Sequence, residues 1–358
     1  MPDTLLSRRK SEHLQIVASQ DVTHKNGTLL DNVQLLHQAL PEINIDDIDL
    51  SVKFFGKQLK APFMITSMTG GAEYAGKLNH NLAEVAQQLG IAFAVGSQRV
   101  MVRHPEVTDD FAVRSDIPDS VLLSNIGAVQ LQEYSPDIIT GLVKAIEADG
   151  ICVHLNAGQE LMQAEGHRDF TGLLDKIARL VEHLDGRVLV KETGAGMSPE
   201  TLKQLDSIGV SYVDVSGAGG TSWTKVEAYR ATDPELKHLG EMFSEWGVPT
   251  AFSVVAARKI MTDKTTIIGS GGIKSGMDAA RCIACGADMA GFARPILLAF
   301  LDSGAQGVSE LIDRYTKELK TAMLLTGSKN IAALKKAPKV YTGELKNWLD
   351  TYGCSGGE

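Results

Sequence analysis

Residues 267–294 read IIGSGGIKSGMDAARCIACGADMAGFAR, and this stretch holds one complete repeating unit of the fold. An apolar run at 267–270 ends in a double glycine, a helical pattern follows, and a second apolar run occupies 289–292. Short apolar runs that are bounded by Gly or Ser are typical of strands buried on both faces. The stretch therefore predicts two parallel strands that are joined by a helix.

Six further runs of this kind precede the stretch at near-regular spacing, at residues 62–67, 91–95, 121–124, 151–155, 187–191 and 212–215. Helical patterns, such as 78–89 and 173–184, lie between them. Eight strands that alternate with helices predict an α/β fold, a single (β/α)8 TIM barrel. The alternative is a doubly wound sheet, which usually has fewer strands and a Gly-x-Gly-x-x-Gly turn after the first one. Here the first run ends in Ser-Met-Thr-Gly-Gly, which favours the barrel.

The rest of the chain surrounds this barrel, which we assign to residues 61–345. Residues 1–60 form an N-terminal extension, and residues 346–358 are expected to be a C-terminal tail. The spacing after the sixth strand is unusually long, which predicts an insertion at 217–250. Long insertions in compact domains are usually functional.

Composition excludes several classes of partner. The 358 residues carry 35 Lys and Arg against 44 Asp and Glu, a net charge of −9 without a basic tract, so we expect no nucleic-acid partner. No apolar run is long enough to span a membrane, and the first residues lack a secretory apolar segment, so we expect a cytoplasmic protein. Four cysteines do not form a disulfide framework. Cys282 and Cys285 lie in an apolar helical pattern and are expected to be buried core residues.

The active site of such a barrel lies at the carboxyl ends of its strands. Polar or charged residues follow every predicted strand here, among them His154, Glu160, Lys191 and Arg294. Gly, Asn and Ser are ordinary turn residues and would need no functional explanation. The four residues named here are not turn residues, so together they indicate a polar active-site mouth.

The clearest signal is a phosphate site at the seventh and eighth strands. Gly271 and Gly272 let backbone N–H groups approach an anion, and Arg294 adds a fixed charge. The alternative is a plain turn beside a surface arginine, but barrels commonly bind phosphate at this pair of loops. With Lys191 and Asn125 inside the mouth, the pattern suits flavin mononucleotide (FMN).

Other candidates remain open on the residues alone. Arg9, Lys10 and His13, with Arg99, would suit a second phosphorylated ligand, or the N-terminal cluster is a solvated basic patch. Glu160 would anchor Mg²⁺ if a diphosphate supplied further oxygens, or it is a helix-start glutamate.

His154 is similarly ambiguous, because a histidine in a strand is usually structural. Its position at the end of a strand, in a polar mouth, makes a functional role equally plausible.

The order of several motifs makes the chain resemble the type 2, FMN-dependent isopentenyl diphosphate isomerases. The motifs are Arg9-Lys10-x-x-His13, His37-x-Ala39-Leu40-Pro41-Glu42, Ser67-Met68-Thr69-Gly70-Gly71, Gly96-Ser97-Gln98-Arg99, His154-Leu155-Asn156-x-x-Gln159-Glu160, Lys191-Glu192 and Ser270-Gly271-Gly272. Lys274-Ser275 replaces an expected Arg-Thr pair, which is a conservative departure.

The resemblance implies an enzyme that interconverts isopentenyl and dimethylallyl diphosphate by a 1,3-allylic proton shift, a step of isoprenoid biosynthesis. It implies reduced FMN as the acid/base, NADPH or another reductant, Mg²⁺ on the diphosphate, and a homo-oligomer, a tetramer or octamer. The lack of an obvious pair of carboxylates in the mouth agrees with proton transfer by a cofactor.

The resemblance also assigns roles by position. The diphosphate would be bound by Arg9, Lys10, His13, Ser97, Gln98, Arg99, Asn156 and Gln159. The hydrocarbon and the flavin face would be contacted by His154 and Gln159, and Mg²⁺ would be bound by Glu160. FMN would be held by Thr66, Ser67, Met68, Thr69, Ser97, Asn125, Lys191, Ser216, Thr221, Gly271, Gly272, Ile273, Ala293 and Arg294. Trp223 would help to shield the cavity from water.

Two other functions compete with this one. An FMN-dependent oxidase or dehydrogenase of small hydroxy acids shares the flavin loops, but it would need a catalytic histidine and an arginine pair for the substrate carboxylate. A barrel that binds flavin or phosphate without catalysis is the second alternative.

Overall fold

The computed structural model describes residues 4–68 and 73–354, and its centre is a closed barrel of eight parallel strands. The strands follow one another around the barrel in the order β10-β11-β4-β5-β6-β7-β8-β9. Their bounds are β4 (Phe63–Ile65), β5 (Ala92–Ala94), β6 (Leu122–Gly127), β7 (Gly150–Leu155), β8 (Val188–Glu192), β9 (Tyr212–Asp214), β10 (Thr266–Gly269) and β11 (Met289–Phe292). Each strand coincides with one predicted apolar run, so the barrel is confirmed and the doubly wound sheet is excluded.

Helices cover the outside of the barrel. They are α2 (Glu73–Leu89), α4 (Pro136–Ala145), α6 (Leu173–His183), α7 (Pro199–Ser207), α10 (Thr250–Ile260), α11 (Gly276–Ala284) and α12 (Arg294–Leu325). Helix α6 shows why they form, because Ile177, Leu180 and Val181 lie on one face and are buried there. Serine side chains cap the starts of α4, α7 and α11, each by accepting a hydrogen bond from an N–H three residues later.

The lower part of the barrel interior is apolar. A hairpin of β2 (Val52–Phe54) and β3 (Lys57–Leu59) belongs to the same apolar cluster as the inward side chains of the barrel strands. The barrel residues of that cluster are Met64, Ala92, Ala94, Val121, Leu123, Cys152, Leu189, Ile268 and Met289. The hairpin therefore closes the amino end of the barrel.

The upper part of the interior is polar, because strand residues two positions apart share a face. Asn125, His154, Lys191 and Ser270 each follow an inward apolar residue of this cluster by two positions. They form a polar layer directly above the apolar one, at the carboxyl ends of the strands. The alternation thus places the candidate residues at the mouth of the barrel.

The N-terminal extension and the C-terminal segments are packed together. Strand β1 (Val33–Leu35) pairs with β12 (Lys339–Tyr341). Along the chain, β12 follows α13 (Ile331–Lys335) and precedes α14 (Gly343–Thr351). Leu349 and Cys354 are buried, so the described part of the expected C-terminal tail, up to residue 354, has side chains packed in the core.

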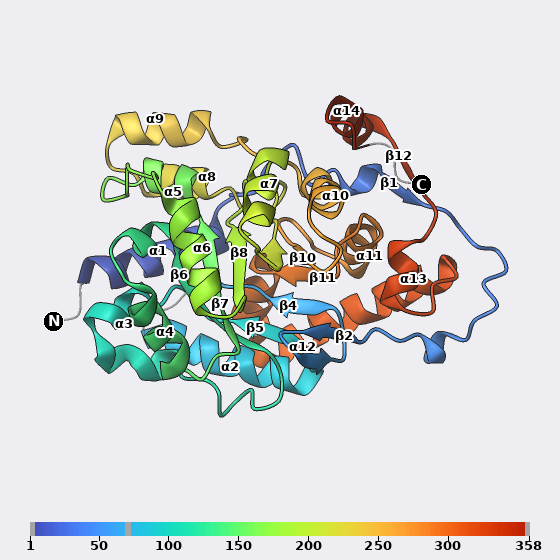
Figure 1. The fold of residues 1–358 in the computed structure, drawn as a ribbon, viewed down its shortest axis with the longest axis horizontal. Helices are drawn as coiled ribbons and strands as arrows, with labels where there is room; N and C mark the ends of the chain where they lie inside the picture. Colours follow the sequence, from blue (N-terminus) through green and yellow to red (C-terminus); the bar gives the residue numbers. More distant parts are fainter. Residues whose placement is uncertain (1–3, 69–72, 355–358) are drawn as a thin grey trace.

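The remaining helices surround the carboxyl end of the barrel. They are α1 (Thr4–Ser19), α3 (Arg99–Arg103), α5 (Ala157–Met162), α8 (Trp223–Arg230) and α9 (Pro234–Met242), and the 3-10 turns are η1 (Leu30–Asn32), η2 (Ile45–Asp47), η3 (Pro105–Asp110) and η4 (Ala128–Gln132). In Figure 1, α1, α5, α8 and α9 lie on the side of the molecule opposite α13 and α14. Within the described residues, none of the helices combines the length and the apolar character needed to cross a membrane.

Candidate active site

A cavity of about 600 Å³ opens at the carboxyl ends of the strands. Side chains from α1, from the strand ends and from the loops that follow them line it together. The predicted site residues among them are Arg9, His13, Thr66, Ser67, Met68, Ser97, Arg99, Asn125, His154, Asn156, Gln159, Glu160, Lys191, Ser216, Thr221, Gly271, Gly272, Ile273, Ala293 and Arg294. The fold therefore brings nearly the whole predicted set to one cavity.

Three predicted residues need separate mention. Thr69 and the side chain of Lys10 lie outside what the structure describes. Gln98 is fully buried, and its amide oxygen accepts hydrogen bonds from the Ser124 hydroxyl and the Asn125 N–H. The expectation that Gln98 contacts a diphosphate is therefore corrected, because it does not line the cavity and instead holds the end of β6 in place.

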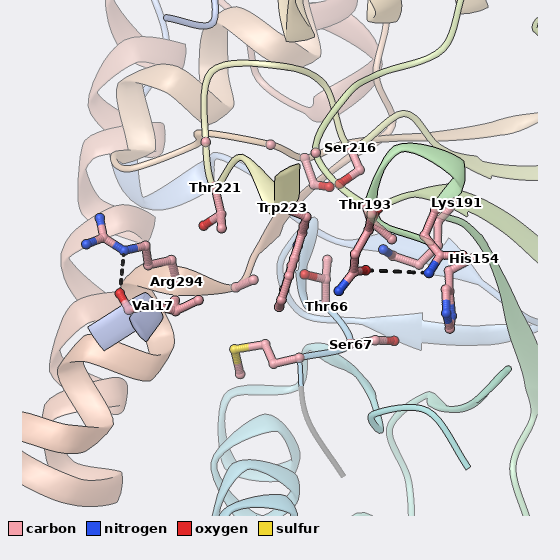
Figure 2. Close-up of a pocket in the computed structure, with 18 of the residues that line it drawn as sticks. Val17, Thr66, Ser67, His154, Lys191, Thr193, Ser216, Thr221, Trp223 and Arg294 are labelled. Atoms are coloured by element: carbon pink, nitrogen blue, oxygen red, sulfur yellow. Dashed lines mark hydrogen bonds between the residues drawn. The ribbon is translucent and has the colours of Figure 1, made fainter. Parts of the chain in front are cut away.

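His154 and Lys191 lie close together at the floor of the cavity (Figure 2), and the amide of Asn125 also lines it. His154 Nδ1 and Asn125 Oδ1 lie 2.9 Å apart, and Lys191 Nζ donates to the Glu192 carbonyl at 2.7 Å. Burial, together with the charge of Lys191, lowers the pKa of His154 to about 3. The imidazole is therefore neutral at physiological pH. Since Asn125 Oδ1 can only accept, Nδ1 carries the proton, and Nε2 is an acceptor without a partner among the described residues.

The loop after β8 is built around the side chain of Glu192. Its carboxylate accepts hydrogen bonds from four successive N–H groups, those of residues 193–196, at 2.5–3.2 Å. Because the carbonyl of the same residue holds Lys191 Nζ, this loop also fixes the direction of the lysine.

Two glycine loops form another wall of the cavity. Gly271 and Gly272 have φ values of +92° and +79°, a region that favours glycine. A Cβ at Gly271 would lie 2.1 Å from the Gly217 carbonyl oxygen, and one at Gly272 would lie 2.5 Å from the Gly219 carbonyl. The loops after β9 and β10 are therefore in direct backbone contact, which leaves main-chain groups rather than side chains at this wall.

Arg294 lies at the rim, across the cavity from His154 and Lys191, with Trp223 between them (Figure 2). Its Nε donates to the Val17 carbonyl at 3.0 Å, so its guanidinium joins the start of α12 to the last turn of α1. Arginine at a helix C-terminus satisfies carbonyls that the helix leaves unpaired.

The cavity fits a flavin on two independent observations. Asn156 Oδ1 lines the cavity, is buried, and has no hydrogen-bond partner among the described residues. Buried polar atoms normally find a partner, so this oxygen indicates a missing ligand. The paired glycine loops also offer the side-chain-free wall that a phosphate requires.

Helices α1, α5 and α8 form the roof of the cavity, and the roof contains a residue that was not predicted from the sequence. Glu227, on α8, is 1% exposed and accepts from Gln159 Nε2 at 2.9 Å and from Gln163 Nε2 at 2.7 Å. Its other partners are His13 Nε2 at 2.9 Å and Arg230 Nη1 at 3.1 Å. Burial opposes ionisation, but the hydrogen bonds and charges of these partners outweigh it and lower the pKa of Glu227 to about 2.

Glu227 thus ties α1, α5 and α8 together above the cavity. One pattern could have indicated Glu227, since it follows Trp223 by one helical turn inside the long insertion that we expected to be functional. His13 also packs edge-on against Trp223, with ring centroids 5.2 Å apart.

Glu160 faces the cavity with its carboxylate partly engaged. Oε1 accepts from Asn156 Nδ2 at 3.0 Å, and Oε2 accepts from the His167 N–H at 2.9 Å. Over the described part of the chain, three or more His, Cys, Asp or Glu side chains nowhere gather as a metal site would require. Protein side chains alone therefore do not build a metal cage here, and a cation would need oxygens from a ligand.

Cys282 and Cys285 are buried on and just after α11, as predicted, and burial raises the pKa of both thiols. They contribute to the core and not to the cavity.

Comparison with known proteins agrees with this geometry. The model of the FMN-dependent dehydrogenase family matches residues 4–109 and 154–340. Isopentenyl-diphosphate delta-isomerase of Methanopyrus kandleri is 42% identical over 97% of this chain and 95% of its own length. The isomerases of Methanothermobacter thermautotrophicus (43%; 98% and 97%) and Rickettsia bellii (44%; 92% and 96%) are similar to the same degree.

Solved structures resemble the fold at much lower identity. Mandelate oxidase with (S)-2-phenylpropionate superposes with a TM-score of 0.66 at 16% identity, covering 94% of this chain and 96% of that one. A flavocytochrome b2 variant with sulfite bound gives a TM-score of 0.67 at 18% identity, with coverages of 90% and 81%. At such identities the likeness shows the barrel fold alone.

Proposed function

Because this chain belongs to the isopentenyl-diphosphate delta-isomerases of the FMN-dependent family, we propose that it moves the double bond of isopentenyl diphosphate by a 1,3-allylic proton shift. We propose NADPH as the reductant of FMN and Mg²⁺ as the cation on the diphosphate. The observation that carries the proposal is one cavity that is lined both by the glycine loops after β9 and β10 and by the cationic side chain of Arg9 from α1.

FMN would occupy the floor and the glycine wall. Its phosphate would meet the backbone of Gly271 and Gly272, with Thr221 and Arg294 nearby, and its ring would face Lys191 and the Ser67 hydroxyl. The remaining contacts would come from Thr66, Met68, Thr69, Ser97, Asn125, Ser216, Ile273 and Ala293. When bound and reduced, the flavin supplies an acid/base group beside the allylic carbons.

The diphosphate would bind under α1. Arg9 and His13 line that part of the cavity from α1, and Arg99 and Asn156 line it from the loops after β5 and β7. Ser97 and Lys10 complete the proposed set. Guanidinium groups suit phosphate oxygens because they donate two parallel hydrogen bonds. An anion held at both ends of the cavity would leave the hydrocarbon over the floor.

The chain's own groups near that hydrocarbon would be His154 and Gln159. A neutral His154 with an unprotonated Nε2 can accept a hydrogen bond without bringing a positive charge to the apolar chain. Gln159 is fixed by its bond to Glu227, so its amide would be presented in one orientation. We propose that both orient the reacting carbons and the proton that moves between them.

Mg²⁺ would bind at Glu160, one carboxylate that lines the cavity beside Asn156. Mg²⁺ commonly uses one or two protein carboxylates, and takes its other oxygens from substrate phosphates and water. The geometry therefore suits a metal that arrives with the diphosphate.

The resemblance to the isomerases extends the proposal to a cytoplasmic homo-oligomer, a tetramer or octamer. Light scattering of the purified protein would measure the mass. A monomer at micromolar concentration would contradict this part of the proposal.

The test of the function is anaerobic turnover of isopentenyl diphosphate with FMN, NADPH and Mg²⁺, beside a control without FMN. We expect dimethylallyl diphosphate only when flavin is present. No product from enzyme with bound, reduced flavin would overturn the isomerase. Bleaching of oxidised flavin by lactate or glycolate would then favour a hydroxy-acid oxidase.

A further inference from the structure

Gln163 lies just after α5, lines the cavity and is only 2% exposed. Its amide bridges two other elements, since Oε1 accepts from Arg9 Nη1 of α1 at 3.0 Å and Nε2 donates to Glu227 Oε1 of α8 at 2.7 Å. Its backbone is held as well, because its N–H donates to Glu160 and its carbonyl accepts from Arg168 Nη2 at 2.7 Å. The amide therefore has a fixed place between a cation and a buried anion.

An amide is the side chain that suits this place. It accepts from a guanidinium at one end, donates to a carboxylate at the other, and adds no charge. The charged groups around it are already numerous, with Arg9 and His13 on α1, Glu227 and Arg230 on α8, and Glu160, Glu165 and Arg168 on its own segment. A carboxylate here would face Glu227, and an apolar side chain would remove one hydrogen bond from Arg9 and one from Glu227.

We propose that Gln163 is a positioning residue, which holds the Arg9 guanidinium ready for the diphosphate; this rests on the proposed function. Arg9 has one other described partner, Glu165, at 3.7 Å on a half-exposed side chain. Such a pair contributes little. Without Gln163 the long arginine side chain would have to be ordered when the ligand binds, and that ordering weakens binding.

The test is a double-mutant cycle read by calorimetry with inorganic pyrophosphate on the FMN-loaded enzyme in Mg²⁺. The variants are Gln163→Met, Arg9→Ala and the double variant. We expect Gln163→Met to raise the Kd for pyrophosphate about tenfold, which corresponds to about 1.4 kcal/mol. In the Arg9→Ala background, Gln163→Met should raise the Kd for pyrophosphate less than about twofold, because the two residues act as one unit.

Gln87→Met is the matched control, since the Gln87 amide also bonds at both ends but lies away from the cavity. Equal effects of Gln163→Met with and without Arg9, no effect at all, or the same loss in Gln87→Met would overturn the proposal. FMN affinity checks the fold of each variant. If Gln163→Met does not fold, Gln163→Asn replaces it, because the shorter amide cannot reach both partners.

Steady-state kinetics, which measure KM and kcat separately, give a second readout. Gln163→Met should raise KM for the diphosphate substrate more than it lowers kcat, and the reverse pattern would contradict a positioning role through Arg9. A wild-type enzyme that forms no product would contradict the proposed function. A wild-type enzyme that forms product, with additive effects of Gln163→Met and Arg9→Ala on the Kd, would contradict this inference alone.

Discussion

His154 and Glu227 are both buried and titratable, yet the protein holds one neutral and the other ionised. His154 has a cation, Lys191, as its charged neighbour, so burial and repulsion lower its pKa together. Glu227 has His13, Arg230 and two amides as neighbours, and these outweigh its burial. The floor of the cavity thus avoids a second positive charge beside Lys191, while the roof keeps a fixed negative one.

The His154 assignment predicts a pH-dependent stability. The unfolded chain binds a proton near pH 6.5, and folded His154 does so only near pH 3, so stability is lost as the pH falls below 6.5. Between pH 7 and pH 5, wild type should lose about 1–2 kcal/mol more unfolding free energy than His154→Gln. Urea denaturation of both proteins at the two pH values measures this difference. Equal losses would contradict the neutral buried imidazole.

The role of Glu160 is tested by Glu160→Gln. The variant keeps the shape of the side chain and removes the charge that would attract Mg²⁺, so we expect turnover to fall by a factor on the order of 10 to 100 with weaker Mg²⁺ dependence. Flavin should remain bound, because Glu160 is not part of the glycine wall. Normal turnover with an unchanged Mg²⁺ requirement would contradict the assignment of Glu160 as the Mg²⁺ ligand.

Among the elements, the strands were the most predictable from sequence. Each apolar run became a strand, and the period of two placed Asn125, His154 and Lys191 at the mouth. The three-residue pair β1 and β12 was not predictable, since its partners are some 300 residues apart and neither has a distinctive pattern. The helix α14 extends into the segment from residue 346 that we expected to be a tail, because that segment is largely polar, although Leu345 and Leu349 are buried.

The roof was not predictable either, for a related reason. The bonds of Glu227 and Gln163 join α1, α5 and α8, which only the closed barrel brings together. Gln98 was misassigned because its neighbours in sequence face the cavity, whereas its own side chain turns back into the protein. Spacing along the chain shows where a loop begins and does not show which way each side chain points.

At the junction of α12 and α1, Arg294→Ala should lower FMN affinity about tenfold or more, because the phosphate would lose a charge-assisted partner. Flavin titration of the apoprotein measures this. Arg281→Ala is the matched control, since Arg281 pairs with Asp31 of the N-terminal extension but does not line the cavity. Unchanged affinity in Arg294→Ala would leave this arginine as a support for α1 alone.

In the molecule as a whole, the barrel supplies the floor and the glycine wall, and the N-terminal extension with α5 and α8 supplies the roof. The mandelate oxidase and flavocytochrome structures share the barrel, which by itself does not determine the reaction. What distinguishes the proposed reaction is that it needs a reduced flavin without net oxidation of the substrate. An isomerase should therefore consume reductant only to reduce the bound flavin.

The most direct measurement is anaerobic turnover of isopentenyl diphosphate in D2O, with NADPH consumption and product counted together. We predict many molecules of dimethylallyl diphosphate for each NADPH oxidised, with deuterium incorporated into the product. One NADPH oxidised for each product molecule would show a redox reaction and would contradict the proposed proton shift.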